Sequence, residues 1–162
     1  ALDVRPDETA ATLHDRLAAL GADMLRRHLD DILAGHIAAV PQPNEGATYA
    51  PMIAKDAGRI DWTRDAAELD RLARAMTPWP GAFTEWNGAT LKVLRARPAT
   101  AGLPDGRPGL VGRVAEGIVV LAGHGGLLLD EVQLAGKRAM SAAEFVRGRP
   151  EFVGAVLGAA QA

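Results

Sequence analysis

The chain has 162 residues and contains no cysteine. A disulfide framework and a thiolate metal site are therefore both excluded. No apolar run is long enough to span a bilayer, and the N-terminus lacks the basic-then-apolar pattern of a signal peptide. This composition is typical of a cytoplasmic protein without a membrane partner, and its 48% of apolar residues can form the core of one or two small domains.

A catalytic constellation is also lacking. Four histidines are scattered along the chain: His14, His28, His36 and His124. None has a second ligand at a metal-binding spacing. Ser141 has no sequence partner that would make it a nucleophile, and Asp130 and Glu131 alternate across a predicted strand, so they face opposite ways. We predict no catalytic residue, no bound cofactor and no metal site in this chain.

The net charge of −2 hides an asymmetry between the two parts of the chain. Residues 1–52 carry 4 basic and 8 acidic side chains, whereas residues 53–162 carry 14 basic and 12 acidic ones. The second part is mildly cationic, which suits weak contact with a polyanion.

Residues 1–38 predict one amphipathic helix. Thr9 is the expected N-cap, because it follows the acidic pair Asp7 and Glu8 near the positive end of the helix dipole. Apolar residues then recur at spacings of three and four as one stripe: Leu13, Leu17, Leu20, Met24, Leu25, Leu29, Ile32 and Leu33. Little else in the first 50 residues could cover this stripe, so we expect it to be exposed or to pair with a second copy of the chain.

Residues 39–57 predict an extended linker rich in proline and glycine. A second helix is expected to begin at Asp65, with Glu68 completing a variant of the capping box. The sequence Pro78-Trp79-Pro80 must end this helix. We expect Trp79 to be buried against the apolar face that contains Leu69, Leu72 and Met76.

Beyond this turn, alternating apolar residues predict five short strands at 83–86, 91–96, 110–115, 118–122 and 127–134. Ser141 and Glu144 form a capping box before a last helix at 144–147. The expected fold class is α+β: an N-terminal helix, a linker, and a small antiparallel OB-like β-barrel with flanking helices. The expected parts are a helical piece at 1–38, the linker at 39–57, the barrel at 58–150 and a tail at 151–162.

Basic side chains of the predicted barrel are the candidate binding site. We expect phosphate contacts from eight of them: Lys55, Arg59, Lys92, Arg95, Lys137, Arg138, Arg147 and Arg149. The alternative is that they are ordinary solvated side chains.

Several stretches together resemble the C-terminal part of bacterial methionyl-tRNA formyltransferase. They are residues 42–51, 58–62, 74–83, 91–94 and 135–143, in that family's order and spacing. Residues 6–10 and 13–17 resemble the last helix of that family's catalytic domain. One departure is Leu134, where the family commonly has proline, and it loosens the following turn.

The resemblance implies a two-domain enzyme of translation initiation. It would transfer a formyl group from 10-formyltetrahydrofolate to the amino group of methionyl-initiator-tRNA. In this family the catalytic residues and the folate pocket lie upstream of the motifs found here. The resemblance therefore implies that residues 58–150 help to hold the tRNA and that this chain alone is inactive. It also implies that the whole enzyme is a monomer, whereas this chain can self-associate through its first helix.

Two other interpretations remain open. One is the C-terminal domain of a related formyltransferase that acts on a sugar nucleotide or on formyl-folate. The other is a free-standing OB-type binding module. Basic groups that converge on one face would favour tRNA, and dispersed groups would favour the related enzyme.

Overall fold

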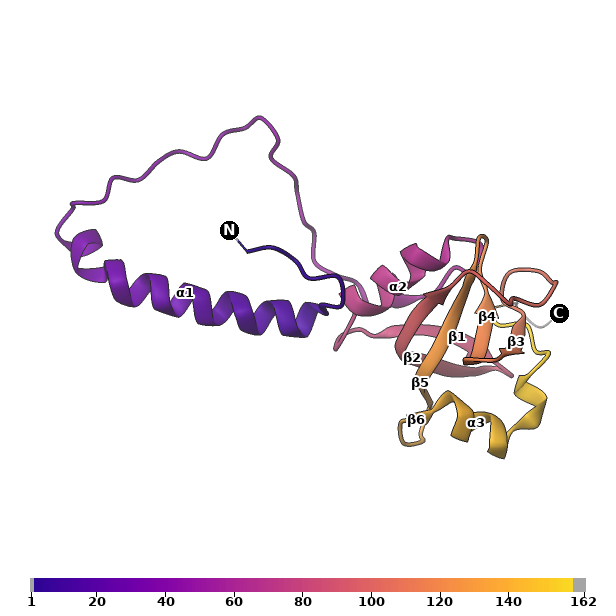
Figure 1. Cartoon of the computed structure of the whole chain (residues 1–162). Coiled ribbons are helices and arrows are strands. Elements are labelled where there is room, and N and C mark those ends of the chain that lie inside the picture. Colours follow the sequence, from indigo (N-terminus) through magenta and orange to yellow (C-terminus); the bar gives the residue numbers. More distant parts are fainter. Residues whose placement is uncertain (1, 159–162) are drawn as a thin grey trace. The chain divides into compact units, whose positions relative to one another are not determined.

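The computed structural model describes residues 2–158, which fall into two compact units, Ala1–Ile53 and Ala54–Ala162 (Figure 1). None of the helices within residues 2–158 combines the length and the apolar character needed to cross a membrane.

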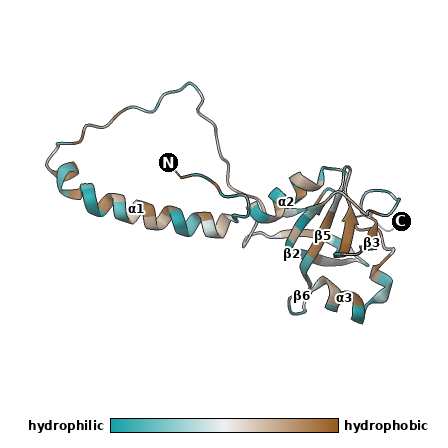
Figure 2. Cartoon of the chain, viewed as in Figure 1, coloured by the Kyte–Doolittle hydropathy of each residue, from teal (hydrophilic) through white to brown (hydrophobic). Residues whose placement is uncertain are grey.

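The first unit contains one helix, α1 (Ala10–Leu33). Thr9 caps it as predicted: its hydroxyl accepts a hydrogen bond from the Thr12 amide at 3.2 Å, and the Thr12 hydroxyl accepts one from the Thr9 amide at 3.0 Å. The helix contains no buried residue, and apolar and polar side chains alternate along it (Figure 2). Leu17 and Leu25 of the predicted stripe are exposed. The expectation of an uncovered stripe is therefore confirmed for this unit.

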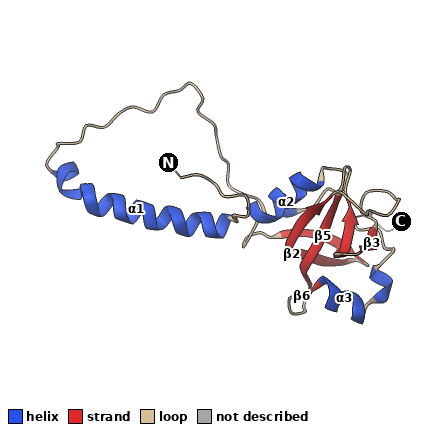
Figure 3. Cartoon of the chain, viewed as in Figure 1, coloured by secondary structure: helices blue, strands red, loops and turns tan. Residues whose placement is uncertain are grey.

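The second unit holds a sheet with two flanking helices (Figure 3). Its elements are α2 (Ala66–Ala75), β1 (Ala82–Trp86), β2 (Ala89–Ala99), β3 (Val111–Val114), β4 (Gly117–Leu121), β5 (Gly126–Leu134), β6 (Met140–Ser141) and α3 (Ala142–Gly148). Two 3-10 turns, Lys55–Gly58 and Pro150–Phe152, complete it. All five predicted strands are confirmed. The sequence did not predict β6, because two residues are too few to show an alternation.

The sheet is antiparallel and open rather than a closed barrel. Its strands follow the order β1-β2-β5-β4-β3, and β6 pairs with β5. In the described part of the chain no ladder joins the edge strands β1 and β3, so the predicted closure is not confirmed. The C-terminal segment occupies this gap instead: the Val111 amide donates to the Ala155 carbonyl at 2.8 Å, and the Gly158 amide donates to the Glu85 carbonyl at 3.2 Å.

This C-terminal segment is part of the core, although a tail was expected from residue 151. Phe152 and Leu157 are buried, and the Leu157 amide donates to the Gly109 carbonyl at 2.8 Å. Residues 159–162 of the expected tail lie outside the described residues. The segment escaped prediction because its alanines and glycines show no periodicity.

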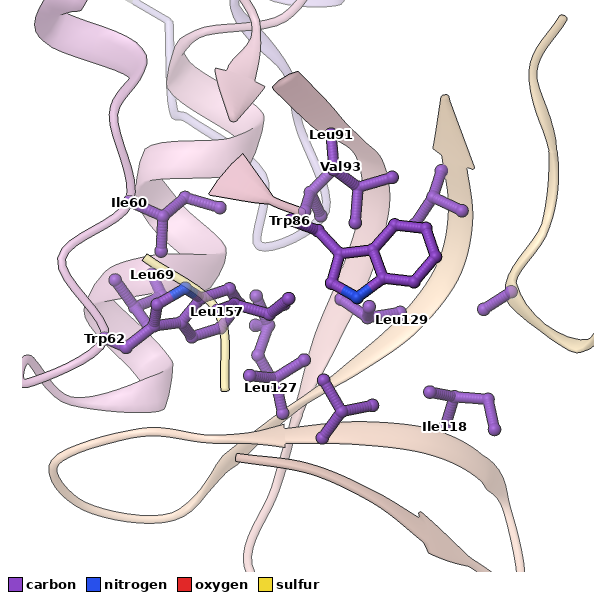
Figure 4. Close-up of a cluster of buried hydrophobic side chains, with 14 of the residues drawn as sticks. Ile60, Trp62, Leu69, Trp86, Leu91, Val93, Ile118, Leu127, Leu129 and Leu157 are labelled. Carbon is purple, nitrogen blue, oxygen red and sulfur yellow. The ribbon is translucent and has the colours of Figure 1, made fainter. Parts of the chain in front are cut away.

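An aromatic cluster forms the centre of the core. Trp86, Phe145 and Phe152 meet edge to face, with ring centroids 5.0–5.5 Å apart. Around Trp86 lie aliphatic side chains from β2 and β5, among them Leu91 and Leu129 (Figure 4). Edge-to-face pairs add to the free energy of burial, so a chain with few aromatics gains much from placing three of them here.

Trp79 is not buried, which corrects the sequence-based expectation. Its side chain is 56% exposed, although the turn Thr77–Pro80 ends α2 as predicted. Trp62 lies near Leu69 of α2 instead (Figure 4), and its indole Nε1 donates to the Thr84 hydroxyl at 3.0 Å. The apolar face of α2 is therefore already covered by Trp62 and the sheet.

Of the two expected capping boxes, the one at Ser141 forms one of its two hydrogen bonds, and its Glu144 carboxylate pairs with Arg138 instead. Ser141 caps α3, because its hydroxyl accepts a hydrogen bond from the Glu144 amide at 3.1 Å. Asp65 is the N-cap of α2 but makes no side-chain capping bond. Glu68, its expected partner, pairs with Arg64 at 3.1 Å, so the capping box predicted there is wrong.

We predict opposite effects for two tryptophan truncations. Trp86→Ala removes the ring shared by both phenylalanines and should lower the free energy of unfolding by ~3–5 kcal/mol. Trp79→Ala removes an exposed ring and should change it by less than about 0.5 kcal/mol. Denaturant unfolding of both variants checks this. Equal losses of stability would contradict the assignment of Trp86 to the core and Trp79 to the surface.

Candidate nucleic-acid interface

A row of four side chains crosses one face of the sheet. Lys92 of β2 is paired with Phe83 of β1 on one side and with Gln133 of β5 on the other, and Arg59 forms a bridge to Phe83. The neighbours of Lys92 along β2, Leu91 and Val93, are buried. Because side chains alternate along a strand, Lys92 and its row partners lie on the opposite face from the core. We call this surface the outer face.

Arg59 is held in place on the outer face. Its Nη1 lies 2.9 Å from Oε1 of Glu85, and its guanidinium carbon lies 5.3 Å from the centroid of the Phe83 ring. Both Arg59 and Glu85 are about half exposed. An ion pair at such exposure contributes little to stability, so a phosphate could replace the carboxylate at little cost.

Lys92 borders a shallow pocket of about 240 Å³. The pocket is lined by Thr90, Lys92, Gln133, Leu134, Ala135 and Gly136. Gln133 links it to the following loop, since its side-chain amide donates to the Lys137 carbonyl at 2.9 Å. Among the described residues neither Lys92 nor Lys137 has a carboxylate within ion-pair distance. These two ammonium groups are therefore available to an anionic ligand.

Arg95 also lies on the outer face, because a bulge interrupts β2 between Val93 and Arg95. The bulge leaves Arg95 opposite Glu131, two positions before Gln133 on β5. Arg95 and Arg97 both approach Asp130, at 4.0 Å and 3.6 Å. The acids of this face thus offset its arginines. Among the described residues, the cations without a carboxylate partner are Lys92 on this face and Lys137 in the loop that follows β5.

The other predicted basic residues lie outside this row. Lys55 is exposed in the 3-10 turn before Arg59. Arg138 pairs with Glu144 of α3, Arg147 is exposed in the last turn of α3, and Arg149 stacks over Phe145 with its guanidinium carbon 4.9 Å from the ring centroid. Of the eight predicted residues, Arg59, Lys92 and Arg95 lie on the outer face, and Lys137 lies in the loop whose backbone is hydrogen-bonded to Gln133. Lys55 lies in the 3-10 turn before Arg59, and Arg138, Arg147 and Arg149 lie around α3.

Sequence reasoning missed Phe83 and Gln133 as members of the row. The alternation of strand residues gives the side on which each lies, but the pairing register that aligns them with Lys92 is set by contacts distant in sequence.

Two carboxyl groups of the described residues, those of Asp61 and Glu8, have shifted pKa values. The pKa of Asp61 is lowered by hydrogen bonds from the Thr63 hydroxyl and amide, and the pKa of Glu8 is lowered mainly by its hydrogen bond to Arg16. A general base works best when its pKa is near the operating pH, so carboxyl groups whose pKa is lowered are unsuited to that role. No group of three or more potential metal ligands is found within residues 2–158. The site is suited to binding an anion.

Solved structures share this fold. HypX from Aquifex aeolicus superposes with a TM-score of 0.67 at 17% identity, over 94% of this chain and 28% of that one. Its complex with tetrahydrofolic acid superposes with a TM-score of 0.66 at 18% identity, over 96% of this chain and 27% of that one. At this identity the likeness shows the fold alone.

Curated sequences show closer relationships. The methionyl-tRNA formyltransferase of Myxococcus xanthus is 50% identical over 146 residues, which are 90% of this chain and 46% of that protein. The methionyl-tRNA formyltransferase of Gluconobacter oxydans is 43% identical over 150 residues, 93% of this chain and 47% of that protein. The chain thus spans about half the length of the curated relatives it matches. Residues 52–150 match the family described as formyl transferase, C-terminal domain, and the chain therefore belongs to that family.

Proposed function

We propose that this chain is the tRNA-positioning part of a cytoplasmic methionyl-tRNA formyltransferase. The whole enzyme transfers a formyl group from 10-formyltetrahydrofolate to the amino group of methionyl-initiator-tRNA at translation initiation. The relatives with identities of 43–50% support this proposal, because they carry that name. We propose no folate site in this chain, and we assign its second unit, despite the open sheet, to the OB-like class.

The outer face is the observation that carries the proposed role. Arg59, Phe83, Lys92 and Gln133 cross four neighbouring backbone segments in one row. Lys137 lies in the loop to which Gln133 is hydrogen-bonded. Two cations, Arg59 and Lys92, separated by an aromatic ring and followed by an amide, suit successive phosphates of a nucleic-acid backbone better than a single small anion. Contacts of this kind hold and orient an RNA without reading its sequence.

The balance of charges sets the expected affinity. Arg59, Arg95 and Arg97 already have carboxylate partners, so each phosphate contact they make must displace Glu85 or Asp130. Phosphate contacts from Lys92 and Lys137 release the counterions condensed on the RNA and break no ion pair within the described part of the protein. We therefore expect weak binding by this chain alone, with a dissociation constant of roughly 10⁻⁴–10⁻⁶ M at physiological salt.

We predict that this chain has no formyl transfer activity by itself. The transfer needs a positioned base and a group that stabilises the tetrahedral oxyanion, and we propose that both lie in the part of the relatives that this chain does not span. Assays with methionyl-tRNA and 10-formyltetrahydrofolate should show no turnover above the uncatalysed rate. Turnover that disappears on substitution of a residue in this chain would contradict the prediction.

A charge reversal on the outer face should weaken tRNA binding. In the double variant Lys92→Glu and Lys137→Glu, both unbalanced cations are lost. The slope of log K against log salt should become shallower by ~0.7–0.9 for each phosphate contact removed. Titration of initiator tRNA at several salt concentrations measures this slope.

The matched control is the double variant Arg107→Glu and Arg113→Glu. It changes the net charge by the same amount, but Arg113 lies on the opposite edge strand, β3, and Arg107 in the loop before it. We expect its salt slope to stay close to that of the parent. If both double variants lose binding equally, only net charge matters and the outer face is not the tRNA site.

We also propose that α1 mediates self-association of this chain, whereas the whole enzyme is a monomer. Leu25 and Leu29 are 55% and 42% exposed on the apolar stripe, and a second copy of the same helix offers a matching surface. Leu25→Glu with Leu29→Glu should lower the average mass in sedimentation experiments towards that of a monomer. Arg26→Glu with Arg27→Glu is the control on the same helix and should leave the mass unchanged. A parent chain that is monomeric at high concentration would refute this proposal.

A further inference from the structure

Trp79 differs from the other two tryptophans in its exposure to solvent. It is 56% exposed, whereas Trp62 and Trp86 are 4% and 6% exposed. It stands between Pro78 and Pro80, whose rings fix their own φ angles and restrict the residue before each. Such a turn has little backbone freedom left to lose, so binding through Trp79 would cost little conformational entropy.

The turn that carries Trp79 borders the outer face. A Cβ atom added at Gly81 would lie 3.8 Å from Cδ and 3.9 Å from Nζ of Lys92, so the lysine side chain extends over this glycine. Trp79 precedes Gly81 by two residues, which places their Cα atoms within roughly 7 Å of each other. The ammonium of Lys92 therefore lies beside the turn that carries Trp79.

A second basic segment packs against the same turn. A Cβ atom added at Gly58 would clash with the carbonyl oxygen of Gly81 and lie 3.5 Å from Cγ of Pro80, so the two backbones are in direct contact. Gly58 ends the 3-10 turn that begins at Lys55, and Arg59 follows it. The turn that carries Trp79 is thus in contact with the segment that leads into Arg59, and it also borders Lys92.

This combination matches the chemistry of single-stranded nucleic acid. A rigid exposed ring offers a stacking surface to any base, and adjacent cations bind the phosphates on either side of that base. A protein-docking site would instead be expected to show apolar side chains around the tryptophan and few charges at its centre. The charge around Trp79 therefore favours RNA as the occupant.

We propose that Trp79 stacks on an unpaired base of the bound RNA, while Lys92 and Arg59 contact the neighbouring phosphates. The proposal rests on the tRNA-positioning role and adds a preference for a single-stranded segment. The outer face alone would bind paired and unpaired RNA without this preference.

Tryptophan fluorescence provides a direct test. Because Trp62 and Trp86 are buried, a change in emission on adding RNA reports mainly on Trp79. The probes are a short unstructured single-stranded RNA and a blunt-ended duplex of the same sequence, titrated into the 162-residue chain. We expect the single strand to quench the emission and to reduce the access of acrylamide to Trp79, and the duplex to do neither.

Three variants separate stacking from charge. Trp79→Ala should weaken binding of the single strand roughly 5- to 150-fold, the range of one base–aromatic stack. It should leave the slope of log K against log salt unchanged, because no charge is lost. Trp79→Phe, which keeps an aromatic face, should recover most of the affinity. Lys92→Ala should make the slope shallower by ~0.7 without removing the quenching at low salt.

The outcomes distinguish the two proposals. If Trp79→Ala binds the single strand as the parent does while Lys92→Ala lowers the salt slope, the stacking inference is wrong and the tRNA-positioning role stands. If Trp79→Ala weakens binding of the duplex as much as it weakens binding of the single strand, the stacking inference is also wrong. If no RNA binds, or if the outer-face variants bind as the parent does, both proposals fail. Quenching by the single strand that is lost in Trp79→Ala and restored in Trp79→Phe supports the inference.

Discussion

The register of β2 is the constraint on which the rest of the second unit depends. This strand pairs with β1 along one edge and with β5 along the other, so its register fixes both neighbours. Leu91 and Val93 point into the core and Lys92 points away from it. A slip of one residue would bury the lysine and expose both apolar side chains. Alternate residues of β2 thus contribute to the core and to the outer face. The bulge before Arg95 places a further cation on the outer face.

The core in turn depends on residues close to the end of the described chain. Phe152 completes the edge-to-face cluster with Trp86 and Phe145, and the segment that follows it covers the edge of β3. An uncovered edge strand offers unpaired backbone groups to other chains. By occupying that edge, residues 154–157 both anchor the sheet and protect it, which explains why the sheet needs no ladder between β1 and β3.

Sequence patterns predicted the elements of this fold better than their contacts. The five strands and the caps at Thr9 and Ser141 follow from local alternation and local hydrogen bonding. Trp62 covers α2 where Trp79 was expected, because which tryptophan packs there is decided by contacts between segments distant in sequence. The same limit applies to the candidate site: sequence identified Arg59, Lys92 and Arg95 as basic candidates, but only the strand register places them on one face.

The central claim is that the outer face holds tRNA, and the lysines of the chain allow a direct measurement. There are three of them, Lys55, Lys92 and Lys137. Their rates of amine labelling can be followed by mass spectrometry with and without saturating initiator tRNA. If the outer face holds the tRNA, labelling of Lys92 and Lys137 should slow severalfold when the tRNA is present, while arginine-specific labelling of Arg113 on β3 stays constant. Unchanged labelling of Lys92 and Lys137 in a complex shown to be saturated would contradict it.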